Sequence, residues 1–98
     1  MTINFENKDN TLVVKLAGRL DTNTSVELED ALSKQEISGD LLFDFKELEY
    51  ISSAGLRLLL AHDKSQKAAG KTLTISNVND VITEIFQVTG FSNILNIK

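Results

Sequence analysis

Two adjacent serines, Ser52 and Ser53, are the residues of this chain best placed for chemistry. They follow the apolar run 41–45 by a few residues and precede the apolar segment 54–69, a pattern that predicts a strand followed by a helix. The first backbone N–H groups of a helix lack partners within it and favour negative charge. A hydroxyl there suits the attachment of a phosphate, although a serine in this place also serves simply as a helix cap. The pattern indicates a switch rather than a catalyst.

The sequence argues against a serine enzyme. Ser53 lacks the Gly-x-Ser-x-Gly surroundings of a nucleophile elbow. The single histidine, His62, lies nine residues later in the same predicted helix, which is about 13.5 Å of rise and about half a turn away. We predict that His62 is a surface residue, and that Asp44, Glu47 and Glu49 form no metal or acid–base site. No catalytic residue, metal or cofactor is expected.

Composition limits the remaining classes of protein. The chain has 98 residues, 42% hydrophobic and 24% charged, which predicts one globular domain over residues 1–98. A net charge of −4 without a basic stripe disfavours nucleic-acid binding. The chain has no cysteine, no leader-like amino terminus and no apolar run of about 20 residues. We therefore expect a cytoplasmic protein without direct membrane insertion.

Hydrophobic periodicity and turn residues predict the order ββαβαβα, followed by a short further strand. The expected strands are 3–8, 11–17, 41–45, 72–76 and 94–97. Three helices are expected. The first begins near 22–24 with a capping box from Thr24 to Glu27, the second begins at 54 and ends at Ala69, and the third begins near 77–80. Connections of this length favour right-handed parallel crossovers after an antiparallel hairpin. The expected fold class is α/β with an α+β-like mixed sheet: four to five strands with helices packed on the sheet.

Three motifs make the chain resemble a STAS domain of the anti-sigma factor antagonist type. They are Gly-Arg-Leu-Asp at 18–21, Phe-Asp-Phe with Ile-Ser-Ser-Ala-Gly-Leu within 43–56, and Val-Thr-Gly-Phe at 88–91. The middle motif is the specific one, and the resemblance covers nearly the whole chain. It implies the STAS fold.

The resemblance also implies partner switching in transcription regulation. In such families the unphosphorylated antagonist binds an anti-sigma factor that is also a serine kinase, and this frees the sigma factor. The kinase phosphorylates the antagonist and so ends the binding, and a serine phosphatase resets it. The family's phosphorylated serine lies two residues before the motif glycine, which is Ser53 here. Ser52 is the second choice, since it stands where the family often has aspartate.

A surface for the partner is expected around Ser53. Helical spacing places Ser53, Arg57 and Leu60 on one stripe, with Leu56 beside it. The apolar turn from Leu56 onward is either core or a binding surface, and Gly55 allows either close approach of a partner or close helix packing. Asp21 is a helix cap or, by resemblance, part of the surface. The expected partner-binding residues are Asp21, Thr24, Ser52, Ser53, Gly55, Leu56, Arg57 and Leu60.

Two further hypotheses concern regulation. Arg57 is expected to pair with the phosphate of Ser53 in the off state. An alternative function is a STAS adaptor subunit of a membrane transport complex or a stress-sensing assembly, without a phosphorylation switch. The sequence leaves open whether the protein forms a weak homodimer, and it does not identify the sigma factor, the kinase or the signal.

Overall fold

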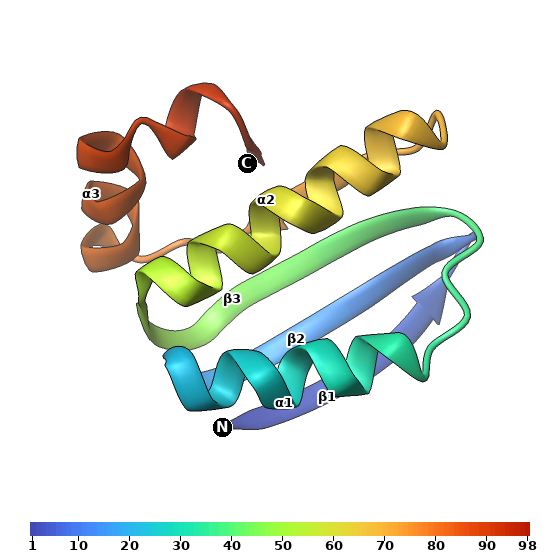
Figure 1. Ribbon diagram of the computed structural model, residues 1–98, viewed down its shortest axis with the longest axis horizontal. Coiled ribbons are helices and arrows are strands. Elements are labelled where there is room, and N and C mark those ends of the chain that lie inside the picture. Colours follow the sequence, from blue (N-terminus) through green and yellow to red (C-terminus); the bar gives the residue numbers. More distant parts are fainter.

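A computed structural model describes residues 1–98, and it has the predicted order of elements (Figure 1). The strands are β1 (Thr2–Lys8), β2 (Thr11–Leu20), β3 (Asp40–Ile51), β4 (Leu73–Ser76) and β5 (Asn96–Ile97). The helices are α1 (Thr22–Ser33), α2 (Ser53–Ala68) and α3 (Asp80–Thr89), with a 3₁₀ turn at Phe91–Asn93 before β5. The short final strand is confirmed.

The five strands form one mixed sheet in the order β1-β2-β3-β4-β5. The β1–β2 hairpin is antiparallel, and its turn residues Asp9 and Asn10 have φ of 47° and 65°, as a two-residue hairpin turn of the I′ type requires. The remaining neighbours pair in parallel. Each right-handed crossover steps to the next strand in the same direction, which places α1 and α2 on the same face of the sheet (Figure 1). We call this the covered face.

The hydrophobic core lies between the covered face and the helices. Strand positions on this face are fully buried, including Val14, Phe43 and Phe45, and the two phenylalanine rings meet edge to face with centroids 6.2 Å apart. Helix residues that pack on them are Leu28, Leu32, Leu56, Leu59, Ile82 and Phe86. The junction between β3 and α2 is therefore anchored on both sides by the same core.

The two central strands are longer than the sequence predicted. β2 continues to Leu20 rather than residue 17, and β3 extends from Asp40 to Ile51 rather than ending at Phe45. The second half of β3 is rich in charged residues because its other face is open to solvent, and the pairing of β2 with β3 shifts register twice along this stretch. The charged residues and the register shifts both interrupt the alternation of apolar and polar residues that predicts a strand. Only Ser52 separates β3 from α2.

The start of α1 differs from its prediction. The helix begins at Thr22, so Thr24 is its third residue rather than its cap. The capping box joins Asp21 to Thr24: the Asp21 carboxylate accepts from the Thr24 N–H at 3.0 Å, and the Thr24 hydroxyl accepts from the Asp21 N–H at 2.8 Å. The predicted box from Thr24 to Glu27 is wrong because the Thr24 hydroxyl is already held by Asp21. The cap role of Asp21 is confirmed.

Candidate functional site

Ser52 is built into the start of α2. Its backbone N–H donates to the Leu20 carbonyl at 2.8 Å, which continues the β2–β3 ladder up to the helix. Its hydroxyl serves as the helix cap and accepts from the Gly55 N–H at 3.4 Å, at the long end of hydrogen-bond range. The side chain is half-buried. Ser52 therefore has a structural role that limits its availability for modification.

Ser53 lies in a different environment, although it is the next residue. It is the first residue of α2 and its side chain is exposed. Because Ser52 supplies the cap, the Ser53 hydroxyl is outside the capping hydrogen bond. The neighbouring helix terminus favours an anion at this position. The geometry thus offers an accessible hydroxyl beside the N-terminus of a helix.

Gly55 lies where the start of α2 packs against the sheet. A Cβ atom built on it would lie 2.8 Å from Ile51 Cγ1 and 2.9 Å from Leu20 Cδ2, and the residue is buried. Real Cβ contacts are not this short, so only glycine lets α2 start against β2 and β3. Of the two alternatives for Gly55, close approach of a partner and close helix packing, the structure shows close helix packing. Gly55 itself is buried, and its effect on the site is to position α2.

The leucines of α2 divide between core and surface. Leu56 is 5% exposed and Leu59 is fully buried, whereas Leu60 is half-buried. The apolar turn is therefore mainly core. The expectation that Leu56 offers contact area is wrong, because its side chain packs beneath the helix. Leu60 is the leucine of the predicted stripe that retains accessible surface.

Arg57 is exposed one turn after Ser53. The ion pairs of the chain join Lys8, Lys15, Lys34, His62 and Lys67 to carboxylates, and Arg57 takes part in none of them. The guanidinium therefore has no ionic partner within the chain, and the residue lies one turn along α2 from Ser53.

Asp21 and Thr24 lie at the start of α1, beside the junction. Their polar atoms are occupied by the capping box, and the Thr24 hydroxyl also donates to the Arg19 carbonyl at 2.7 Å. The Thr24 backbone N–H, and then its hydroxyl, lower the pKa of Asp21 from its ordinary value of 3.8. A partner that contacts these residues would meet side chains already held in place.

This cap predicts a pH dependence of stability. Since the pKa of Asp21 is lowered in the folded chain, the stabilisation is complete above the ordinary value of 3.8 and is lost as pH falls through the lowered value. Asp21→Asn keeps the acceptor oxygen but cannot titrate. We expect its melting temperature to fall less steeply than that of the parent protein between about pH 5 and about pH 2. Parallel slopes in thermal denaturation of the two proteins would contradict the assignment.

One feature of the site was not predicted from the sequence. The Arg19 guanidinium stacks over the Tyr50 ring, 4.5 Å from its centroid, and the two residues are paired across β2 and β3. Their neighbours Leu20 and Ile51 point to the covered face, so this pair lies on the opposite face, just before Ser52. Only the register of β2 with β3 brings the two side chains together; no short-range sequence signal indicates it.

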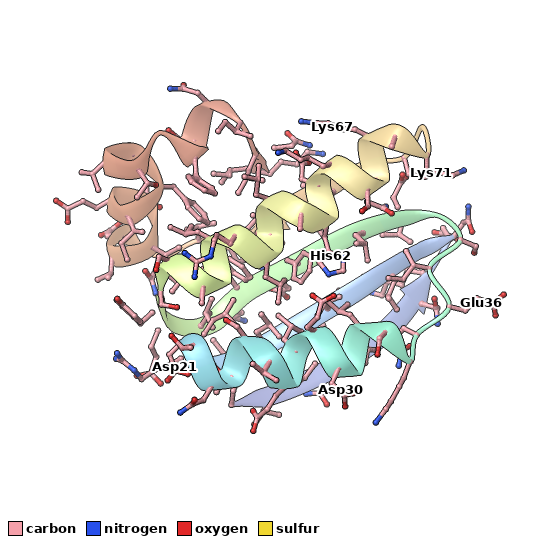
Figure 2. The ribbon with its side chains drawn as sticks, viewed as in Figure 1. Asp21, Asp30, Glu36, His62, Lys67 and Lys71 are labelled. Atoms are coloured by element: carbon pink, nitrogen blue, oxygen red, sulfur yellow. The ribbon has the colours of Figure 1, made fainter.

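His62, predicted to be a surface residue, is partly buried at the surface between α1 and α2. Its side chain is 18% exposed, and its Nε2 lies 2.9 Å from the Glu29 carboxylate. The pair joins α2 to α1, and Figure 2 shows His62 directed from α2 toward α1. Because α2 is continuous from Ser53 to Ala68, His62 cannot reach Ser53.

None of the helices is long and apolar enough to cross a bilayer.

The fold and this junction define a class of protein. The chain belongs to the STAS domain family: residues 3–96 match the family described as Mlab, STAS domain. The resemblance drawn from the motifs is therefore confirmed. The chain is 31% identical over 102 residues to the anti-sigma-B factor antagonist of Staphylococcus aureus, an alignment that covers 100% of this chain and 94% of that protein.

Solved structures show the same fold. A putative anti-sigma factor antagonist from Thermotoga maritima matches with a TM-score of 0.90 at 13% identity, over 97% of this chain and 84% of that one. The anti-sigma factor antagonist SpoIIAA in its unphosphorylated form matches with a TM-score of 0.83 at 20% identity, over 99% and 88% of the two chains. The α/β fold with its five-stranded mixed sheet is that of STAS domains.

Proposed function

We propose that this protein is an anti-sigma factor antagonist controlled by phosphorylation of Ser53. In its unphosphorylated form it binds an anti-sigma factor, a serine kinase, and so releases a sigma factor in the cytoplasm. The observation that carries the proposal is the exposed hydroxyl of Ser53 as the first residue of α2, outside the cap made by Ser52. Two facts about relatives support it: the name of the S. aureus protein, and the structures of SpoIIAA solved in unphosphorylated and phosphorylated forms.

Phosphorylation would affect the partner more than the fold. A phosphoserine carries about −1.5 to −2 charges, and a helix N-terminus stabilises an anion. The protein itself therefore has little reason to unfold. A partner that covers Ser53 would have to accommodate the bulk and desolvate the charge, which ends binding. A separate serine phosphatase would restore the active form.

The proposed contact surface follows the exposed side of α2. Ser53, Arg57 and Leu60 form its centre, because all three have accessible side chains at helical spacing. Ser52 and the capped start of α1, with Asp21 and Thr24, lie at its edge. Gly55 and Leu56 are buried beneath this surface and pack α2 against the sheet. The surface is thus presented by a helix end that the core holds in place.

The pairing of Arg57 with the phosphate predicts a stability effect confined to one form. Arg57→Ala is expected to lower the melting temperature of the Ser53-phosphorylated protein by about 4 °C, since it removes a charge-assisted contact worth about 0.5–1 kcal/mol. The unphosphorylated protein should be nearly unaffected, and Arg57→Lys should retain part of the effect. Equal shifts in both forms, measured by calorimetry, would rule the pairing out.

Mass spectrometry of the protein isolated from its native cells tests the proposed function. One phosphoryl group mapped to Ser53 is expected under some growth conditions. A group at Ser52 would keep the mechanism but assign it to the other hydroxyl. If no growth condition yields a modified protein, the switch is wrong and a STAS adaptor in a transport or stress-sensing assembly is the better description.

A further inference from the structure

Helix α3 carries apolar side chains toward the core and also toward solvent. Ile82 and Phe86 are buried in the core, with 0% and 1% exposure. Val81 and Val88 lie on another side of the helix and are 55% and 78% exposed. Ile85 is partly buried and lies between the two valines, four residues after the first and three before the second. Val81, Ile85 and Val88 thus form one stripe along the helix, which we call the α3 stripe.

No other element covers the α3 stripe. Figure 1 shows α3 at one end of the molecule, and no other helix or strand lies beyond it in this view. The other strongly exposed large apolar residues are Val26, the only one on α1, and Ile94, after the 3₁₀ turn. Exposed apolar residues are ordinary when they are scattered singly, whereas a set aligned on one helix face marks a contact surface.

The stripe has an acidic border. Asp80 and Glu84 are exposed on α3, and neither takes part in an ion pair. Glu84 lies beside the middle of the stripe, three residues after Val81 and four before Val88. From residue 77 to residue 97 the chain has no lysine or arginine. The two carboxylates are therefore not balanced by any base of their own segment.

The end of β3 adds to this negative charge. The Leu48 carbonyl accepts from the side-chain amide of Asn79 at 2.8 Å, which places this part of β3 next to the start of α3. Glu47 and Glu49, on either side of Leu48, are exposed and have no ion-pair partner. The single base of the stretch 46–49 is Lys46. The surroundings of the stripe thus favour a positively charged partner.

A second copy of this chain matches the stripe poorly. A two-fold contact would pack α3 antiparallel to the same helix of the other copy. Because Glu84 lies at the middle of the stripe, this arrangement would bring the two Glu84 carboxylates together, and like charges repel. The same carboxylates disfavour an anionic lipid surface. The α3 stripe therefore requires a partner that combines apolar side chains with positive charge.

We propose that the α3 stripe binds an amphipathic helix of a partner protein, one with an apolar stripe bordered by lysine or arginine. The apolar side chains of that helix pack between Val81, Ile85 and Val88, as ridges of one helix fit the grooves of another. Its basic side chains pair with Asp80 and Glu84. The stripe spans seven residues, or about 10.5 Å, so the contact covers two turns of each helix. The inference does not depend on the proposed function, because it uses no residue of α2.

Titration of the isotope-labelled protein with a designed helical peptide, followed by amide NMR shifts, tests the site. The probe has three heptads with leucine at positions a and d and lysine at positions e and g, whose like charges keep it from pairing with itself. We expect saturable shifts centred on residues 79–90 and a dissociation constant on the order of 100 µM or tighter. The same peptide with glutamate in place of lysine should bind at least about 5-fold more weakly. No saturation at about 1 mM of the lysine peptide, or equal binding of both peptides, would overturn the proposal.

The exposed valines provide a matched pair of variants. The double variant Val81→Ser with Val88→Ser is expected to weaken binding of the lysine peptide at least about 10-fold. Val26→Ser is the control, because Val26 is a valine on α1 that is 69% exposed. All three positions are exposed, so the substitutions leave the core intact. An equal loss with Val26→Ser would contradict the site. If sedimentation shows a dimer that the double variant converts to a monomer, a second copy occupies the stripe and the proposal is wrong.

Charge reversal separates the local effect of Glu84 from the net charge. Glu84→Lys and Glu36→Lys change the net charge equally, and Figure 2 shows Glu36 at the opposite end of the molecule from α3. Affinity for the lysine peptide should fall about 5-fold with Glu84→Lys and less than about 2-fold with Glu36→Lys. Equal losses would mean that the peptide responds to the overall charge of −4 and not to α3.

Discussion

Ser53→Asp is expected to lower the affinity for the anti-sigma factor by about 100-fold, whereas Ser53→Ala should bind nearly as well as the parent protein. The aspartate places a permanent charge on the exposed first residue of α2. Desolvating a charge in an interface costs several kcal/mol, and about 2.7 kcal/mol corresponds to 100-fold. Removal of the hydroxyl alone leaves the shape of the surface almost unchanged.

The measurement is isothermal titration of the two variants with the purified anti-sigma factor from the same organism. Ser65→Asp is a suitable control, because Ser65 is also an exposed serine of α2 but lies about three turns from Ser53 and more than one turn beyond Leu60. Its affinity should match that of the parent protein. Equal affinities of Ser53→Asp and Ser53→Ala would contradict the switch, and a loss with Ser65→Asp would show that the assay responds to charge in general.

Gly55→Ala is expected to destabilise the folded protein by about 2–3 kcal/mol. In an ordinary helix position the same change is favourable by roughly 1 kcal/mol, so the sign alone tests the packing argument. The added Cβ would lie 2.8 Å from Ile51 and 2.9 Å from Leu20, and both of these side chains are fixed in the core. The helix must therefore move away from the sheet or the core must repack.

Urea denaturation of Gly55→Ala, with Ala61→Gly as the control, measures this effect. Ala61 is exposed on the same helix, so the reverse substitution there should cost about 1 kcal/mol through helix propensity alone. A lower free energy of unfolding in both variants would show that alanine is favoured at position 61 and is excluded at position 55 for steric reasons. Stabilisation by Gly55→Ala would show that α2 does not need the close approach.

This prediction also connects packing to function. The start of α2 carries Ser52 as its cap and Ser53 as its first exposed residue, and both follow directly from β3. If a Cβ at position 55 displaces the helix, Ser53 moves with it. We therefore expect Gly55→Ala to weaken partner binding even at a temperature where the variant is folded.

Much of the fold could be predicted because its signals are local. The hairpin turn at Asp9 and Asn10, the helix start near residues 77–80 and the helix stop at Gly90 depend on backbone conformations and side-chain bonds within a few residues. The order of strands and helices follows from them. Strand ends were predicted less well, since β3 runs on through charged residues whose side chains face solvent and carry no periodic apolar signal.

The residues of the site show the same division between local and distant causes. The amino-acid sequence by itself determined the order of elements, the STAS family and the place of two serines at a helix start, because each depends on types and spacing along the chain. Only the tertiary structure decided which serine is the cap, that Gly55 and Leu56 belong to the packing, and that Arg19 stacks on Tyr50. It also placed His62 against Glu29 and buried the side chain of Asp63. Apart from the capping bond of Ser52, these contacts join residues far apart in the chain, and their geometry follows from strand register and helix approach, which no local pattern encodes.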